Sequence, residues 1–292
     1  MKKKNYRSLS DQYRKKGKSF LSSEEASAYA LARMPATQAA ISAVFKELRL
    51  RYSGNVERFL DLGAGTGAGV LAAREAFSTI SEALLVESNP HMRKEGESRV
   101  EAQWVGADLF HVDFPESDCA LFGYSYGELH PQKRLSLLEK VFDKSQLIVV
   151  VEPGTPRGYE NVLEARNHLL SKGGRMVAPC PHEIGCPMVG GDWCHFSVRV
   201  SRTKEHRQLK EAHLGYEDEK FSYVAVAKEG ATPAEGRILR HPLKQKGHVK
   251  LRICTEEGIV ETTVSKKQGD DYREARKACW GGGTSLHRSK PH

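Results

Sequence analysis

The sequence predicts an α/β fold in which a parallel sheet is covered by helices on both faces. Apolar runs of strand length alternate with helical patterns from residue 56 to residue 170. Each run is apolar nearly throughout, which is typical of strands that are buried on both faces. A glycine-rich turn joins the first run to the first helix, as it does in doubly wound folds that bind nucleotides.

The chain begins with a basic arm, residues 1–20, which carries eight Lys and Arg residues against one acid, Asp11. We expect the arm to be flexible or ordered only on a partner. The N-terminus has no apolar signal core, and no apolar run approaches the roughly 20 residues of a membrane helix. We therefore expect no membrane partner and no disulfides. The composition of the arm leaves a mitochondrial presequence open.

Residues 21–54 are predicted to form a helical preface. Ser22 or Ser23 with Glu24 or Glu25 offers N-terminal capping, and apolar residues follow at helical spacing. Pro35 should divide this stretch into two helices.

The central unit is predicted over residues 55–173 and 216–230. Helices are expected after the glycine turn, near residue 99, over 131–142 and over 158–170. The strands are expected at 56–63, 83–88, 103–109, 118–125, 145–154 and 221–228.

The alternation of strands and helices ends after Gly173. Residues 174–215 and 236–281 are predicted as a cysteine cluster and an RNA-facing region. They should contain a small β hairpin around Glu256–Gly258 and a short helix over 270–280. Residues 282–292 are predicted as a tail.

A nucleoside site is predicted at the ends of the first three strands. Gly63, Gly65 and Gly67 let the backbone turn sharply and approach a ligand at the N-terminus of a helix. Asp61 precedes them, Glu87 ends the second strand and Asp108 ends the third. Glu87 could accept both ribose hydroxyls, and Asp108 an adenine amino group.

Two ligands compete for this site, NAD(P) and S-adenosylmethionine. A dinucleotide fingerprint reads G-x-G-x-x-G, whereas the spacing here is G-x-G-x-G with Asp61 in front. An acid at that position suits the cationic methionine moiety and disfavours pyrophosphate. The DLGAGTG pattern with Glu87 and Asp108 resembles the class I (Rossmann-like) methyltransferases, and S-adenosylmethionine is the favoured ligand.

No catalytic residue can be named from the sequence. The fourth strand ends in Tyr124-Ser-Tyr126-Gly127-Glu128-Leu-His130, without the Asn/Asp-Pro-Pro-Tyr/Phe motif common in amino-group methyltransferases. Glu128 and His130 are weak candidates for a base. A strand end followed by a helix start explains them equally well.

A proline- and glycine-rich loop, residues 177–194, carries Cys180, Cys186 and Cys194. Loop cysteines at this density in a protein without export favour a metal site over a cross-link or a core. Cys254, Cys279, His182 or His195 could supply a fourth ligand, and a histidine would suggest zinc. Cys119 fits a core. Pro179–Cys180 is similar to the nucleophile of cytosine-5 methyltransferases, but the neighbouring cysteines favour a ligand role.

The net charge of +8 is concentrated in two segments. Besides the arm, residues 237–252 carry six cations and no acid, which suits a polyanion such as RNA. These cations are Arg237, Arg240, Lys244, Lys246, Lys250 and Arg252.

Several motifs together resemble the methyltransferase-like family associated with the small ribosomal subunit, which comprises mitochondrial assembly factors and bacterial relatives. The resemblance extends over residues 29–281. The motifs are ARMPAT (32–37), LDLGAGTG (60–67), VEPGTPRG (151–158), VAPCPHEIGCP (177–187), WCHFSVRVSR (193–202), FSYVAVAK (221–228) and SKKQGDDYREARKACWG (265–281).

The resemblance implies a class I methyltransferase fold with a cysteine-rich iron–sulfur insertion. It implies a [4Fe–4S] cluster on Cys180, Cys186, Cys194 and Cys254. The last residue is assigned because the family motif R-P-x6-V-x-L-x2-C reads His241-Pro242 through Val249, Leu251 and Cys254 here. Zinc is the alternative. The resemblance also implies S-adenosylmethionine as cofactor and small-subunit (16S-type) ribosomal RNA as partner.

Two functions follow, with a minor third. The chain is either an S-adenosylmethionine-dependent ribosomal RNA methyltransferase or a non-catalytic ribosome-assembly factor that keeps the fold. A redox or iron sensor is the third possibility. We expect a monomer off the ribosome, in a bacterial cytoplasm, with the mitochondrial matrix as the alternative.

Overall fold

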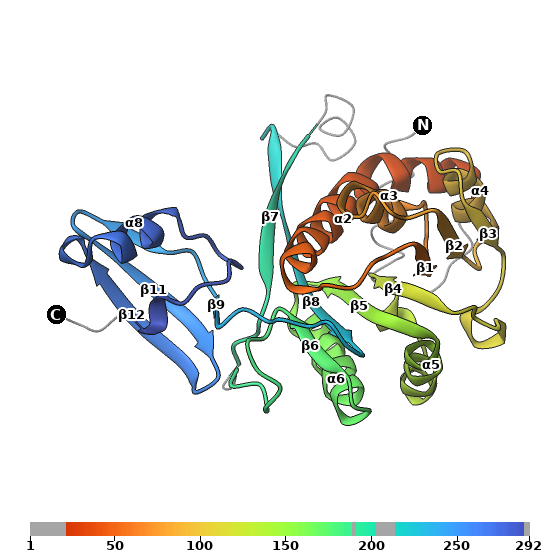
Figure 1. Cartoon of the computed structure of the whole chain (residues 1–292). Helices are drawn as coiled ribbons and strands as arrows, with labels where there is room; N and C mark the ends of the chain where they lie inside the picture. Colours follow the sequence, from red (N-terminus) through yellow and green to blue (C-terminus); the bar gives the residue numbers. More distant parts are fainter. Residues whose placement is uncertain (1–21, 189–190, 203–213, 289–292) are drawn as a thin grey trace.

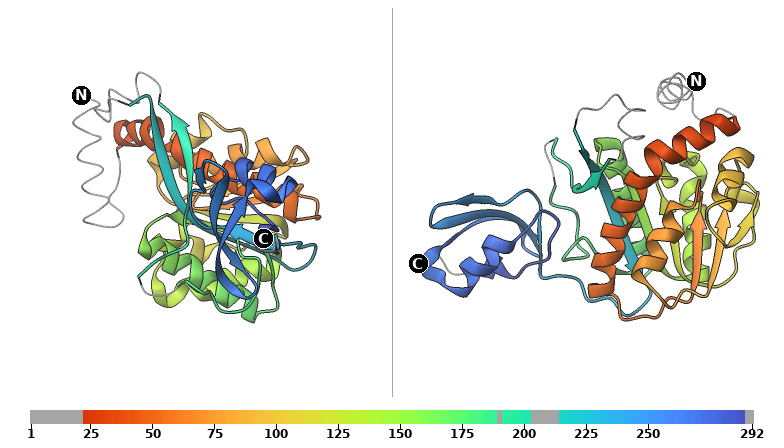
Figure 2. Two further views of the ribbon diagram at one scale, coloured as in Figure 1. Left: turned by 90° about the vertical axis from the view of Figure 1, so that its left-hand side faces the viewer. Right: turned by 90° about the horizontal axis from the view of Figure 1, so that it is seen from above.

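The computed structural model describes residues 22–188, 191–202 and 214–288. The predicted basic arm and residues 203–213 lie outside these ranges. A sheet of eight strands forms the larger part, and a second sheet of four strands forms a lobe beside it (Figures 1 and 2). In the ranges described, no helix is both long enough and apolar enough to cross a membrane.

The larger sheet has the strand order β3-β2-β1-β4-β5-β8-β6, and β7 also pairs with β8. The first five strands of this order are parallel, as predicted. Their bounds are Gln103–Val105 (β3), Glu82–Val86 (β2), Arg58–Leu62 (β1), Ser117–Gly123 (β4) and Ser145–Pro153 (β5).

The predicted late strand is longer than expected and runs against the others. β8 (Tyr216–Ala227) is antiparallel to β5, to β6 (Arg175–Ala178) and to β7 (Phe196–Ser201). The α/β prediction is confirmed, but the prediction of a wholly parallel sheet is wrong. The apolar run at 221–228 signals burial on both faces, which a central antiparallel strand shares with a parallel one. β6 and β7 were not predicted.

Helices cover both faces of the larger sheet, as predicted (Figure 1). α2 (Ser23–Arg51) and α3 (Ala68–Ala76) pack on one face, while α5 (Pro131–Lys144) and α6 (Pro156–Ser171) pack on the other. Alternate residues of each strand enter the two cores, because successive side chains point to opposite faces. In β1, Phe59 belongs to the first core, whereas Leu60 and Leu62 belong to the second.

α2 is one helix of 29 residues, so the predicted division at Pro35 is wrong. Its start is as predicted, because Ser22 and Glu25 form a capping box. Pro35 removes one helical hydrogen bond, but the helix continues because both halves pack on neighbours. The half that follows Pro35 buries Ile41, Val44 and Phe45.

The remaining elements of the larger part are short and lie between the strands. They are α4 (Pro90–Glu97), η1 (Leu109–His111) and η2 (Tyr126–Glu128).

The smaller sheet consists of β9 (Gly236–Ile238), β10 (Leu243–Gln245), β11 (His248–Thr255) and β12 (Gly258–Ser265), all antiparallel. β11 and β12 are the predicted hairpin. Its core is covered by α8 (Asp270–Lys277), after a single turn, η3 (Lys266–Gln268). Part of the predicted tail packs here, since Leu286 of η4 (Leu286–Arg288) is 2% exposed. An apolar side chain that fits this core holds the segment on the sheet.

Candidate functional site

The glycine turn between β1 and α3 has the conformation that the sequence predicts. Gly63, Gly65 and Gly67 have φ of 76°, 56° and 85°, a region that side chains with a Cβ rarely adopt. At Gly63 a Cβ would also lie 2.6 Å from the Cβ of Ser125. The turn therefore brings the backbone close to the end of β4, where a ligand of doubly wound sheets binds.

Glu87, which follows β2, holds this turn in place. Its Oε2 accepts a hydrogen bond from the backbone N–H of Gly65 at 2.9 Å, and its Oε1 accepts one from the backbone N–H of Asn89 at 2.7 Å. The predicted ribose contact of Glu87 would come from a side chain that already orders the glycine turn.

Asp61, at the end of β1, is 2% exposed. Burial raises its pKa to about 7, against a hydrogen bond from the backbone N–H of Val70 that lowers the pKa, and the nearby Glu87 carboxylate raises it further. Its Oδ2 has no hydrogen-bond partner among the described residues. Gly69 makes room for this carboxyl, because a Cβ there would lie 2.4 Å from Oδ2. A cationic ligand would favour the ionised form of this buried carboxyl.

Asp108 lies exposed beyond β3 and caps η1, where its Oδ1 accepts from the backbone N–H of Phe110 at 3.0 Å. Asp61 thus lies at the end of β1, and Glu87 and Asp108 follow the two strands beside it, so all three are at the carboxyl ends of adjacent parallel strands. Glu87 contacts the glycine turn, whereas no hydrogen bond joins Asp108 to it in the described structure.

Glu128 and His130 are exposed, in η2 and just before α5. The end of β4 contains a different polar group, which the sequence reasoning missed. Tyr124 has a φ of 61°, and its Oη donates to Glu219 of β8 at 3.3 Å. Arg33 of α2 donates to the same carboxylate at 3.0 Å. The only local signal was Tyr124 itself, because Arg33 and Glu219 are 186 residues apart.

The four cysteines that the resemblance assigned line one cavity of about 40 Å³. Cys180 follows β6, Cys186 and Cys194 lie in the loop before β7, and Cys254 lies in β11 of the smaller sheet. The cavity is therefore built from both sheets. Its other walls include Tyr159, Arg166, His182, Met188, Arg237 and Leu239.

Cys254 is buried, the other three cysteines are half-buried, and the thiols are close enough to influence one another. Burial raises the pKa of Cys254 to about 12, and the thiols of Cys180 and Cys186 raise it further. Burial likewise raises the pKa of Cys180 and Cys194. Cys186 accepts a hydrogen bond from the hydroxyl of Tyr159 at 3.2 Å. Thiolates at these positions would need a cationic partner in the cavity.

The four cysteines share one cavity lining, which bears on the kind of metal centre that they could hold. Within the described ranges, no three His, Cys, Asp or Glu side chains are spaced to hold one metal ion. A tetrahedral zinc ion with Zn–S bonds of ~2.3 Å would hold its sulfurs about 3.8 Å apart. A polynuclear cluster places iron and sulfide between its thiolates and needs a wider arrangement.

Of the other candidate ligands, His182 lines the cavity, whereas Cys119, Cys279 and His195 do not. Cys119 is fully buried in β4, and Cys279 is exposed and outside the cavity. His182 lines the cavity, with Nε2 3.5 Å from the sulfur of Cys254. His195 instead stacks on Trp193 at a ring separation of 5.1 Å.

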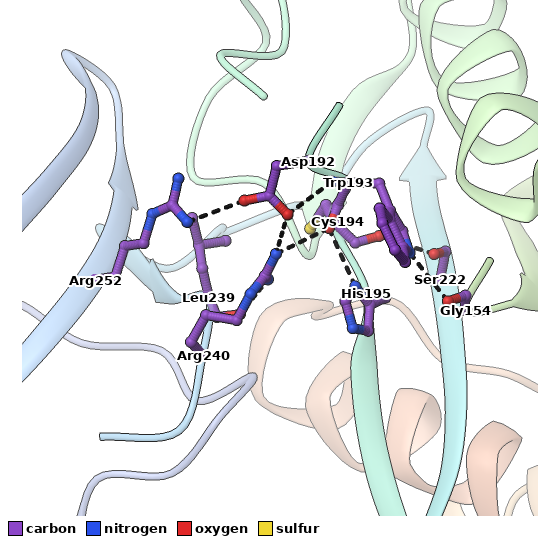
Figure 3. A network of polar contacts seen from close by, with 9 residues as sticks. All are labelled: Gly154, Asp192, Trp193, Cys194, His195, Ser222, Leu239, Arg240 and Arg252. Carbon is purple, nitrogen blue, oxygen red and sulfur yellow. Dashed lines mark hydrogen bonds and ion pairs between the residues drawn. The ribbon is translucent and has the colours of Figure 1, made fainter. Parts of the chain in front are cut away.

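The loop segment Asp192–His195 is held from both sides (Figure 3). Asp192 pairs with Arg240 and, at 2.9 Å, with Arg252 of the smaller sheet. On the other side the indole N–H of Trp193 donates to the carbonyl of Gly154 at 3.0 Å, and Ser222 donates to the carbonyl of Cys194 at 2.8 Å. Cys194 therefore sits where the two sheets are joined.

Three arginines of the predicted basic segment form ion pairs within the protein. Arg237 is 1% exposed and pairs with Glu47 at 2.8 Å, while Arg240 and Arg252 pair with Asp192. Three exposed lysines of the segment form no ion pair with a described residue, and Lys266 and Lys267 of η3 adjoin them across the hydrogen bond from Lys266 to Gly247. We call these five the lysine edge: Lys244, Lys246, Lys250, Lys266 and Lys267.

The chain resembles proteins associated with the mitochondrial ribosome. The family model described as mitochondrial small ribosomal subunit Rsm22 matches residues 23–284. The Rsm22-cox11 tandem protein 2, mitochondrial, of Schizosaccharomyces pombe is 27% identical over 327 residues, with 87% of this chain and 42% of the relative covered. The ribosome assembly protein METTL17, mitochondrial, of Homo sapiens is 28% identical over 288 residues, with 87% and 61% covered. The chain thus spans about half the length of these relatives.

Among solved structures, the magnesium protoporphyrin IX methyltransferase ChlM of Synechocystis PCC 6803 with bound S-adenosylmethionine is similar. It is 9% identical, with a TM-score of 0.44 over 77% of this chain and 97% of that chain. A score below 0.5 carries no conclusion on function.

Proposed function

This chain belongs to the Rsm22 family of mitochondrial small ribosomal subunit proteins, and we propose that it is a methyltransferase-like factor that assists assembly of the small ribosomal subunit. The family match confirms the resemblance found in the sequence motifs. One observation supports the proposal most: four cysteines from both sheets surround one cavity, and the smaller sheet also carries the lysine edge. A cofactor-binding unit is thereby joined to a surface for a polyanion.

We propose S-adenosylmethionine as the ligand of the glycine turn. The buried Oδ2 of Asp61, which has no partner among the described residues, and the positive-φ glycines support a ligand with a cationic group that approaches the backbone closely. Asp61, Glu87 and Asp108, with Gly63, Gly65 and Gly67, would line the site. Isothermal titration with S-adenosylmethionine and with NAD tests this choice; binding of NAD alone would contradict it.

We propose that Cys180, Cys186, Cys194 and Cys254 hold a [4Fe–4S] cluster. Four thiols that line one cavity, of which Cys254 is buried and the other three are half-buried, support a cluster over a single zinc ion. Arg237 Nη2, a buried donor without a described partner, belongs to a residue that lines the same cavity and suits an anionic occupant. The cluster would join the loop after β6 to β11, and thereby hold the two sheets together.

Anaerobic purification tests the cluster. Wild-type protein should be brown, with broad absorption near about 400 nm and roughly four irons per chain. Cys254→Ser should lose the iron, because its thiol lines the cavity, while the matched variant Cys279→Ser should keep it. Colourless protein with one zinc ion per chain would contradict the cluster.

We propose that the lysine edge meets ribosomal RNA. Its lysines are exposed and lack described ion pairs, so they can neutralise phosphates. The basic arm, residues 1–20, would add to this contact.

The mitochondrial names of the relatives favour the mitochondrial matrix over the bacterial cytoplasm that the sequence led us to expect, and that expectation is not confirmed.

Between the two functions considered, the contacts of Tyr124 favour assembly without methyl transfer. Its hydroxyl is already bonded to Glu219, which Arg33 also pairs, at the strand end where an acceptor would be received. Immature small subunits incubated with tritiated S-adenosylmethionine should therefore gain no label in their RNA, while the protein should still sediment with them. Label that Glu87→Ala abolishes would establish the methyltransferase instead.

A further inference from the structure

Arg166 is a buried cation that pairs with no carboxylate among the described residues. It lies in α6, is 3% exposed and lines the cysteine cavity. One nitrogen, Nη2, donates to the carbonyls of His182 at 3.1 Å and Ile184 at 2.7 Å, and Nη1 donates to the amide oxygen of Asn167 at 2.9 Å. Its Nε has no hydrogen-bond partner in the part of the chain that the structure describes.

Such a group is costly unless something compensates its charge. A buried charge needs a counter-ion as well as hydrogen bonds, because neutral carbonyls replace only part of its hydration. The described lining of the cavity contains no carboxylate, and its most acidic groups are the thiols, ahead of the phenols of Tyr159 and Tyr223. Arg166 lines the same cavity as Cys180 and Cys254.

The other arginine of the cavity wall has a carboxylate partner. Arg237 pairs with Glu47 at 2.8 Å, and the same carboxylate oxygen also accepts from Arg51 at 3.0 Å. Arg166 is thus the arginine of the cavity wall that has no carboxylate partner among the described residues, so its positive charge is available to an occupant of the cavity.

We propose that Arg166 is the counter-ion of an anionic metal–thiolate centre in the cysteine cavity, and that its charge raises the reduction potential of that centre. The inference rests on the proposed cluster. Four thiolates carry more negative charge than an oxidised cluster core neutralises, and one-electron reduction adds a further negative charge. A fixed positive charge beside the centre stabilises the reduced form more than the oxidised form. Through its hydrogen bonds to the carbonyls of His182 and Ile184, Arg166 also holds the loop between Cys180 and Cys186 in place, which is the bracing role tested below.

Two substitutions separate charge from bracing. Arg166→Gln removes the charge but keeps a donor, and Arg166→Lys keeps the charge but loses the planar guanidinium that donates to Asn167 through one nitrogen and to two carbonyls through the other. Arg175→Gln is the matched control, because Arg175 is exposed and pairs with Glu183 at the surface.

The experiment is an anaerobic titration of the reconstituted full chain with dithionite, followed by electron paramagnetic resonance, together with iron and sulfide assays. Arg166→Gln should have a more negative potential by at least the 59 mV that corresponds to a tenfold change for one electron. Arg166→Lys should shift less, and Arg175→Gln should match wild type.

An unchanged potential in Arg166→Gln at full iron content would overturn the proposal. If Arg166→Gln cannot hold the cluster, Arg166→Lys decides: retention supports the counter-ion, and loss shows that only bracing matters. Failure of the proposed cluster is seen separately, as wild-type protein without iron and sulfide.

Discussion

Asp61 shows how the fold prepares a residue for a ligand. The carboxyl is buried at the end of β1, accepts one backbone hydrogen bond, and leaves Oδ2 without a described partner. A pKa of about 7 means that the group is only partly ionised near neutral pH. A cationic ligand would favour the ionised form, so ligand binding and proton release at Asp61 should be linked.

This linkage gives a prediction on stability. The pKa of Asp61 is about 7 when folded against an ordinary 3.8, so between these values the folded protein binds the proton more tightly than the unfolded chain. The resulting stabilisation is complete below pH ~4 and is lost as the pH rises to ~7. Asp61→Asn removes this dependence. Relative to wild type, its unfolding free energy should rise with pH in this window by up to roughly 1.4 kcal/mol per pH unit.

Urea unfolding at several pH values without ligand measures the difference. Asp118→Asn is a suitable control, because hydrogen bonds with Arg58 and two backbone N–H groups outweigh burial and hold the pKa of Asp118 below its ordinary value. A constant difference between wild type and Asp61→Asn across the window would contradict the prediction.

At the scale of elements, Arg237 ties together segments that are distant in the sequence. From β9 it donates to the carbonyls of Pro179 and Gly281, both at 2.8 Å, and pairs with Glu47 of α2. The helix of the larger part, the cysteine loop and the C-terminal segment therefore meet at one buried side chain. The sequence places Arg237 in an RNA-facing run, and its burial makes that placement wrong for this residue.

Loss of Arg237 should therefore destabilise the protein strongly. Arg237→Met leaves the carbonyls of Pro179 and Gly281 without this donor and Glu47 with Arg51 alone, and removal of one partner of a buried pair costs about 3–5 kcal/mol. Arg175→Met, at an exposed pair, should change the unfolding free energy by less than about 0.5 kcal/mol. Urea denaturation compares the two. Equal effects would show that Arg237 has no such role.

The sequence predicts much of this fold, because strand burial, the glycine turn and the hairpin have local signals. The five parallel strands and their covering helices were expected, whereas β6 and β7 were too short or too polar to recognise. The predicted division at Pro35 is wrong because tertiary packing continues α2 through a residue that breaks isolated helices.

The site was predictable only where its residues follow strand ends or match a family motif. Asp61, Glu87 and Asp108 have such positions. Arg33 and Glu219 could not be found, because their contact depends on how α2 crosses β8 and leaves no mark in either segment. Arg166 could not be found either, because its lack of a described carboxylate partner depends on the tertiary fold.

At the scale of the whole molecule, the lysine edge places exposed positive charge on the lobe formed by the smaller sheet, where we propose that RNA binds. Arg240 and Arg252 are used internally by Asp192, and the lysine edge remains exposed. Binding to RNA through lysines releases counterions and is therefore sensitive to salt.

Removal of four lysines from this edge should weaken that dependence. For Lys244, Lys246, Lys266 and Lys267 changed together to Gln, the plot of log affinity against log salt should become less steep by about 0.7–0.9 for each phosphate that is no longer neutralised. Filter binding to small-subunit ribosomal RNA fragments measures this slope. A control with four exposed lysines of the larger part changed to Gln, Lys46, Lys94, Lys133 and Lys172, should keep the wild-type slope. Equal slopes for the two variants would place the RNA contact elsewhere.

The cysteine cavity also has a consequence for the order of events during synthesis. Cys180 and Cys254 are 74 positions apart, and β8 and β9 lie between them in the chain. While the ribosome is still making β11, the larger sheet can already pair all its strands, but the cavity has an open wall. The proposed cluster needs all four thiols, so it would be inserted only after β11 has been synthesised. Insertion of the cluster would therefore be a late step that completes the cavity wall.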